Sequence, residues 1–141
     1  MKQIAREAGG TINDVLLAVC GGALRRYLSA QGALPKTSLV AGMPVSLKSA
    51  QDEVGNKLSY IMSPFFTDEA NDLRRLQRVI KVTAAAKAEL GRMSTTAAQD
   101  YYALIMAPAI LLTVTGNATS VRPAPSAILS HVPGSREKLY L

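Results

Sequence analysis

The chain has 141 residues, a net charge of +6 and a hydrophobic fraction of 48%, with only 18% charged residues. This length allows one domain with its own core or one half of a larger one, and the apolar excess predicts surface that a further domain, a second copy or lipid covers. Aromatic residues make up only 5% and do not alternate with basic ones, which argues against nucleic acid, while one cysteine and one histidine argue against disulfides and metal sites.

The N-terminal ten residues do not have the pattern of a signal peptide, because they are charged and end in a glycine pair. No stretch reaches the roughly 18 uninterrupted apolar residues of a transmembrane helix. The longest candidate, residues 101–114, is shorter and carries Pro108. Cys20 lies in an apolar helical pattern, which favours a small buried residue and fits a reducing compartment. We therefore expect a cytoplasmic protein that attaches at most to the surface of a membrane or lipid droplet.

The clearest helix is predicted to begin at Thr11, which can cap the first turn while Asp14 completes a capping box. Gly32 and Pro35 are expected to end this helix. The glycine pair 21–22 interrupts it at a cost of roughly 1 kcal/mol for each residue, so we expect another backbone to pack closely there. Apolar residues follow the spacing of one helical face: Ile12, Val15, Leu16, Val19, Ala23, Leu24 and Tyr27.

Two strands are predicted next. Residues 39–47 are apolar and partly β-branched, and Pro44 indicates a strand end or a sheet edge. A polar loop over 48–57 leads to a second strand over 58–66, where Pro64 has the same meaning.

A second helix is predicted over 68–90, with Gly91 as its cap, and a third over 94–112, kinked or split by Pro108. A short strand over 127–132 follows a loop. The predicted order is therefore helix, strand, strand, helix, helix, strand, which indicates a mixed α/β fold without an internal domain boundary. The inner stripe of the second helix is predicted at Leu73, Leu76, Ile80 and Ala84. The basic residues expected on its solvated face are Arg74, Arg75, Arg78 and Lys81.

Few residues offer chemistry of their own. Ser130 and His131 are adjacent in a predicted strand, so their side chains point to opposite faces and do not form a dyad. His131 is therefore expected to be structural or to line a pocket. Asn13 and Asp14 are the most pointed polar pair, and two interpretations remain open. They cap the helix, or Asn13 lies at the mouth of a buried channel where its amide orders a water, a loop or a substrate group.

Four blocks of the sequence, in order, resemble the bacterial wax ester synthase/diacylglycerol acyltransferase family over its C-terminal region. Residues 11–28 are similar to the family's T-x-N-D-V-x-L-A…G-A-L-R-R-Y-L, and residues 40–47 to its V-A-M-V-P-V-S-L/V-R strand. Gly55 and Asn56 match its Gly-Asn. Residues 130–141 are similar to S-N-V-P-G-P-x-x-P-L-Y-L, although His131 and Ser135 stand where the family has Asn and Pro.

The resemblance implies one half of a fold like the CoA-dependent (chloramphenicol acetyltransferase-like) acyltransferases, with a mixed sheet, helices and a tunnel between two halves. It implies transfer of an acyl group from acyl-CoA, as co-substrate, to a fatty alcohol or diacylglycerol. The family's H-H-x-x-x-D-G motif is absent from the sequence, so we expect no catalytic residue here and read residues 1–141 as a C-terminal domain that lacks its N-terminal half. The matched positions imply these substrate-binding residues: Asn13, Asp14, Ser46, Gly55, Asn56, Ser130 and His131.

Two alternatives remain open. The chain could be a non-catalytic lipid-surface or interaction module of the same fold, or half of a condensation-type or polyketide-associated acyltransferase. In the acyltransferase reading, the missing half is the main partner, acyl-CoA and a lipid alcohol are the substrates, and no other cofactor is needed.

Overall fold

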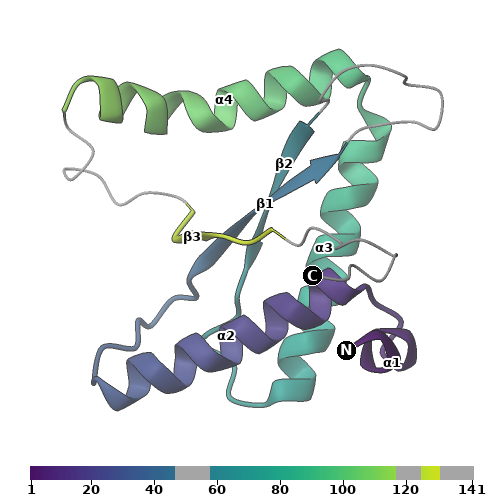
Figure 1. The fold of residues 1–141 in the computed structure, drawn as a ribbon, viewed down its shortest axis with the longest axis vertical. Coiled ribbons are helices and arrows are strands. Elements are labelled where there is room, and N and C mark those ends of the chain that lie inside the picture. The colour runs from purple at the N-terminus through teal and green to yellow at the C-terminus, as the bar shows by residue number, and fades with distance from the viewer. Residues whose placement is uncertain (47–57, 117–124, 131–141) are drawn as a thin grey trace, which may run out of the picture.

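The computed structural model describes residues 1–46, 58–116 and 125–130 (Figure 1). The order of the helices and strands agrees with the prediction, apart from a short first helix that the sequence does not predict. The mixed α/β class is confirmed. The elements are α1 Lys2–Glu7, α2 Ile12–Ala30, β1 Val40–Ser46, β2 Leu58–Pro64, α3 Asp72–Arg92, α4 Thr95–Val114 and β3 Ala127–Ile128.

The three strands of the described residues form one sheet in the order β2-β1-β3. β1 pairs antiparallel with β2, from Val40 opposite Pro64 to Ser46 opposite Leu58, and parallel with β3. β1 is therefore the central strand, although it contains Pro44. The carbonyl of Gly42 accepts from the Leu129 amide on the β3 side. Pro44, two residues further, points its nitrogen to the same side, past the end of β3, and so leaves the ladder to β2 intact.

The glycine pair of α2 allows the helix to approach the core. A Cβ added to Gly21 would overlap the backbone carbonyl of Phe65, so the expected close backbone contact is confirmed there. At Gly22 the neighbour is instead a side chain, because an added Cβ would lie 2.8 Å from Nη1 of Arg75. The core is formed by α2, α3 and the strands, and its buried residues include Val15, Leu17, Ala18, Ala41, Met43, Ile61, Phe65, Leu76 and Val79.

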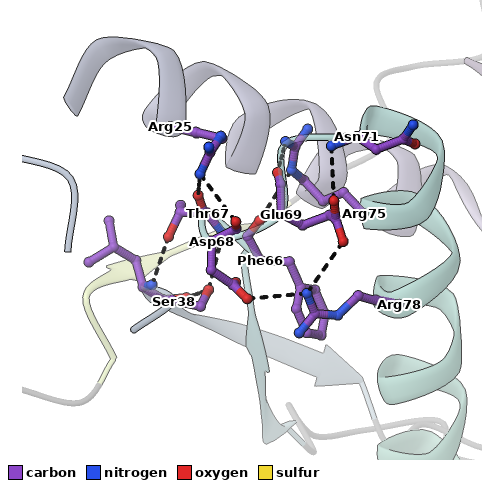
Figure 2. A network of polar contacts seen from close by, with 10 residues as sticks. Arg25, Ser38, Phe66, Thr67, Asp68, Glu69, Asn71, Arg75 and Arg78 are labelled. Atoms are coloured by element: carbon purple, nitrogen blue, oxygen red, sulfur yellow. Dashed lines mark hydrogen bonds and ion pairs between the residues drawn. The ribbon is translucent and has the colours of Figure 1, made fainter. Parts of the chain in front are cut away.

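Arg75 corrects the expectation that the basic residues of α3 lie on a solvated face. Its side chain is 2% exposed and donates hydrogen bonds to the carbonyl oxygens of Phe66 and Glu69 (Figure 2). It also pairs with the carboxylate of Asp72. A buried guanidinium is tolerated only where such acceptors surround it. The two carbonyl acceptors, Phe66 and Glu69, lie in the connection between β2 and α3, which the pattern of α3 alone does not reveal. The other basic residues of the predicted face are exposed: Arg74, Arg78 and Lys81.

The connection from β2 to α3 is held from both helices. Arg25 of α2 donates to the carbonyl oxygens of Thr67 and Asp68, at 2.7 and 3.2 Å. Phe66 has a φ of 52°, in the left-handed region that bulky residues rarely adopt. The guanidinium of Arg78 lies 4.2 Å from the centre of the Phe66 ring. These contacts hold the β2–α3 connection in place between the helices α2 and α3 (Figure 2).

The inner face of α3 differs from the prediction. Leu76 is buried and Ile80 half-buried, as expected, but Leu73 and Ala84 are exposed. The face of α3 that is buried is rotated about the helix axis relative to the predicted face. It includes two polar residues, Arg75 and Thr83. The buried residues of α3 are Arg75, Leu76, Val79, Thr83 and Leu90.

The ends of α3 also differ from the prediction. The helix begins after Asn71, whose side chain accepts a hydrogen bond from the Arg74 amide, and not at Asp68. It continues through Gly91 to Arg92, so Gly91 is not its cap.

The helix predicted over 94–112 is present as α4, which begins after its cap Ser94 and ends at Val114. It continues through Pro108 without splitting. It lies across one end of the two long strands (Figure 1). Its window Thr96–Val114 is long and apolar enough to cross a membrane by length and composition, with a mean hydropathy of 1.3 and only 6% of the window buried. The window passes on its average and is not an uninterrupted apolar run, because Gln99 and Asp100 lie in its first part.

Candidate functional site

The candidate site lies at the first turn of α2. Thr11 caps the helix by accepting a hydrogen bond from the Asp14 amide, and the Thr11 amide donates to the Asp14 carboxylate at 2.7 Å. This is the capping box that the sequence predicts. The Thr11 hydroxyl also donates to the same carboxylate oxygen, at 2.7 Å. The box fixes the backbone of this turn and therefore the position of Asn13 beside Asp14.

The Asp14 carboxylate is buried and joins α2 to α3. Its other oxygen accepts a hydrogen bond from the hydroxyl of Thr83, at 2.6 Å, and lies 3.8 Å from the Lys87 ammonium. Burial alone raises the pKa of Asp14, but the hydrogen bonds from Thr83 and Thr11 and the charge of Lys87 outweigh it, so this pKa lies below its ordinary value. Asp14 is thus an ionised structural anchor whose oxygens are already occupied.

Asn13 differs from Asp14, because it is exposed and makes no hydrogen bond within the described residues. It lines a pocket of about 210 Å³ beside the sheet. That volume is smaller than typical ligand sites, so the pocket holds a small polar group or one stretch of a longer molecule. Its polar lining converges from two helices and its apolar lining comes from two strands. The lining residues are Asn13, Asp14, Lys87, Met43, Pro44, Val45 and Ile61.

A larger groove of about 450 Å³ lies between α1, α2 and α3 and contains none of the predicted site residues. Its walls are mostly apolar. Its charged residues are already paired, because Asp72 lies 3.3 Å from Arg26 and also pairs with Arg75. We favour the smaller pocket as the candidate site. Unlike the larger groove, it places an amide that makes no hydrogen bond within the described residues and an ammonium beside an apolar floor.

The remaining predicted residues are only partly placed. Ser46 ends β1 opposite Leu58, at the end of the strand that supplies Pro44 and Val45 to the pocket. Ser130 is exposed and follows the last bonded residues of β3. The other three predicted residues, Gly55, Asn56 and His131, lie outside the described residues, so the site can be judged only around Asn13 and Asp14.

The sequence analysis missed Thr83 and Lys87. They lie four residues apart, so they share one face of α3. The spacing indicates from the sequence that the two side chains share a face. Only the fold shows that this face lies against the first turn of α2. Together the pocket residues can hold and orient a neutral or anionic oxygen, through the amide of Asn13 and the ammonium of Lys87. Asp14 is a poor general base, because its lowered pKa makes the carboxylate weakly basic and both of its oxygens already accept hydrogen bonds.

Comparison with known proteins points in one direction. The family described as WS/DGAT C-terminal domain matches residues 54–141. The chain is 35% identical, over 139 residues, to the O-acyltransferase WSD of Acinetobacter baylyi, covering 99% of this chain and 30% of that protein. Its fold is similar to that of the wax ester synthase/diacylglycerol acyltransferase from Marinobacter aquaeolei VT8, with a TM-score of 0.75 and 32% identity. That match covers 94% of this chain and 29% of the solved one. The chain therefore spans about a third of the length of the proteins it matches.

Proposed function

This chain belongs to the wax ester synthase/diacylglycerol acyltransferase family, and we propose on that premise that it serves as the C-terminal part of an O-acyltransferase. The reaction proposed is transfer of a fatty acyl group from acyl-CoA to the hydroxyl of a fatty alcohol or a diacylglycerol, which gives a wax ester or a triacylglycerol. The observation that carries this proposal is the shared fold with the solved Marinobacter enzyme over nearly all of the chain.

The chemistry divides between this chain and the part of a family enzyme that it does not contain. The acceptor oxygen attacks the thioester carbonyl carbon and gives its proton to a base, and the carbon–sulfur bond breaks as CoA leaves and is protonated. The family's H-H-x-x-x-D-G motif would supply that base, and it is absent from this sequence. The role of this chain would be to bind and orient the substrates.

The pocket at the first turn of α2 suits the role of binding and orienting a substrate. Its floor of Met43, Val45 and Ile61 is apolar and would contact a stretch of acyl chain. Asn13 has an amide without a partner in the described residues, so it can donate to a substrate carbonyl or to an ordered water. Asp14 would not touch substrate, because its hydrogen bonds are made within the fold, and it acts by fixing the turn that carries Asn13.

The partners follow from the same proposal. The main partner is the N-terminal part of a family enzyme, and acyl-CoA and a lipid alcohol are the substrates. The positive charge of the chain would favour the phosphates of CoA or an anionic membrane or lipid-droplet surface. Arg74 is exposed and available for this, whereas Arg75 is buried and Arg78 already pairs with Asp68 and Glu69. A cytoplasmic or peripheral membrane location accords with that use of charge.

A second candidate, a non-catalytic interaction module, is favoured by one observation: most of α4 is apolar and exposed. An exposed apolar helix fits a module that binds a partner as well as it fits part of an enzyme. The two candidates differ in whether acyl transfer occurs once the rest of a family enzyme is supplied.

The test places this chain in the Marinobacter enzyme, in exchange for the 29% that it matches, and measures CoA release from palmitoyl-CoA and hexadecanol. We expect turnover by this chimera and none by the 141-residue chain alone. The same chimera with its histidine motif changed to alanine supplies the background rate. A folded chimera with only background turnover would count against the enzyme proposal and would favour the non-catalytic interaction module. Turnover by the isolated chain would contradict the proposed division of the chemistry.

A further inference from the structure

The outer part of α4 is apolar around its whole circumference and lies open to solvent. We refer to residues 103–114 as the α4 arm. The arm contains no charged residue, and each of its residues is exposed or half-buried. Leu104 is 73% exposed, Leu111 65% and Val114 80%. A helix that is apolar on every side is ordinarily enclosed, either in a larger protein core or in a membrane.

The first turns of α4 are attached to the sheet. Ala98 is buried, and its carbonyl accepts a hydrogen bond from the hydroxyl of Ser59 on β2, at 3.1 Å. The rings of Tyr60 and Tyr102 lie 5.9 Å apart, centre to centre. The helix therefore has a fixed base, and the α4 arm extends from it beyond the sheet (Figure 1).

This attachment argues against a membrane as the occupant. Twelve residues of α4 follow Tyr102, and at 1.5 Å per residue they extend about 18 Å, against about 30 Å of hydrocarbon. A helix that lies flat in the membrane surface needs a polar, basic face. The α4 arm has no lysine or arginine on any side. An apolar groove in a protein remains as the occupant that fits.

We propose that the α4 arm docks into an apolar groove of the N-terminal part of a wax ester synthase/diacylglycerol acyltransferase polypeptide. This inference rests on the proposed function, because the partner is the part of a family enzyme that the chain does not match. About 70% of the length of the matched relatives lies outside the match, which is more than enough protein to form such a groove. The groove is apolar and uncharged at its floor, because the α4 arm offers no charge to pair.

The test is a binding measurement, so its outcome is separate from acyl transfer. The tagged 141-residue chain is co-expressed with the N-terminal 71% of the Marinobacter enzyme, and the amount of partner that co-purifies is quantified. We expect an equimolar complex with the unaltered chain. Leu104→Lys with Leu111→Lys alters one side of the α4 arm, and Ile110→Lys with Val114→Lys alters another. Both double variants should reduce capture at least tenfold, because an enclosed helix contacts its groove on all sides.

A matched control carries the same chemical change elsewhere. Tyr27 and Leu73 are exposed to a similar degree, at 64% and 62%, on α2 and α3. The variant with Tyr27→Lys and Leu73→Lys should capture as much partner as the unaltered chain. Circular dichroism and thermal unfolding establish that all the variants are folded, as their exposure predicts.

Three outcomes would overturn the proposal. The first is no capture by the unaltered chain, and the second is equal loss in the control variant. The third is unchanged capture in both α4 variants. In that case, two further measurements identify the occupant. If the unaltered chain floats with phosphatidylglycerol vesicles and the α4 variants do not, the occupant is a lipid surface. If the unaltered chain is a dimer and the α4 variants are monomers, the occupant is a second copy of the chain. Capture without turnover would support the docking while counting against the enzyme proposal.

Discussion

The hydroxyl of Thr83 in α3 donates a hydrogen bond to the carboxylate of Asp14 in α2, with 2.6 Å between the oxygens, although the two residues are 69 positions apart in the sequence. This bond joins the first turn of one helix to the middle of another. It also satisfies a buried charge, which would otherwise be costly. The turn that carries Asn13 is thereby fixed from outside its own helix as well as by the capping box.

Thr83→Val should destabilise the chain by about 1–3 kcal/mol, because it keeps the shape of the side chain and leaves one buried carboxylate oxygen without its main donor. Urea denaturation at pH 7 measures the effect as a lower midpoint with an unchanged slope. Thr113→Val is the control, because the Thr113 hydroxyl bonds only to a carbonyl on the exposed surface of α4. It should change stability by less than about 0.5 kcal/mol. Equal effects of the two substitutions would contradict this account of Asp14.

The stability of the chain should fall at acid pH partly through Asp14. Its pKa in the folded chain lies below the ordinary value of 3.8, so the unfolded chain binds a proton first as the pH falls. The contribution of Asp14 is therefore complete at neutral pH and is lost from about pH 5 downwards. The free energy of unfolding should fall more between pH 5 and pH 3 in the unaltered chain than in Asp14→Asn.

The comparison isolates Asp14 from other acids. The Arg75 hydrogen bond and charge hold the pKa of Asp72 below its usual range as well, so Asp72 contributes in the same pH window. That contribution is present in both proteins and cancels in the difference. Parallel pH curves for the unaltered chain and Asp14→Asn would show that the folded environment does not favour the ionised form of Asp14.

Gly21→Ala should destabilise the chain by about 1–3 kcal/mol, although alanine is the better helix former. The added Cβ would overlap the backbone carbonyl of Phe65, which has no side-chain freedom to move away. Gly91→Ala is the matched control, because nothing lies within 4 Å of a Cβ added there. It should stabilise α3 by up to about 1 kcal/mol. Opposite signs in thermal unfolding are the expected result, and the same sign in both would refute the packing argument.

Arg75→Leu should cost about 3–5 kcal/mol, because it leaves the carbonyl oxygens of Phe66 and Glu69 without their buried donor. Arg75→Lys should recover only part of this loss, since one ammonium does not reach all the acceptors of a planar guanidinium. Arg74→Leu, at the exposed neighbouring position, should change stability by less than about 1 kcal/mol. Chemical denaturation of the three variants checks the ranking, and equal losses at positions 74 and 75 would contradict it.

The sequence predicts what depends on near neighbours. The capping box needs only Thr11 and Asp14, three residues apart, and the fold contains it. The order of helices and strands follows from local periodicity in the same way. The glycine pair of α2 is also informative, because two glycines in a helix are costly unless something fills their space, and the carbonyl of Phe65 does so at Gly21.

The sequence does not predict what depends on distant partners. Periodicity predicts an inner face of apolar residues for α3, whereas Arg75 and Thr83 lie on it. Both are polar, and each is buried only because acceptors on other elements meet it, at the β2–α3 connection and at Asp14. The candidate site has the same limitation: Asn13 and Asp14 could be named from the sequence, but Lys87 reaches them only through the packing of α3 on α2.

Asn13→Ala separates the two interpretations of the pair at α2. The amide of Asn13 makes no hydrogen bond within the described residues, so its removal should change the free energy of unfolding by less than about 0.5 kcal/mol. In the chimera with the Marinobacter enzyme it should lower turnover about tenfold or more, since losing one substrate-oriented donor costs on the order of 1–3 kcal/mol. Asn71→Ala makes the same substitution at the cap of α3 and should do the reverse, with about 1 kcal/mol of lost stability and unchanged turnover. If Asn13→Ala instead lost stability and kept its rate, this asparagine would belong to the fold, as Asp14 does.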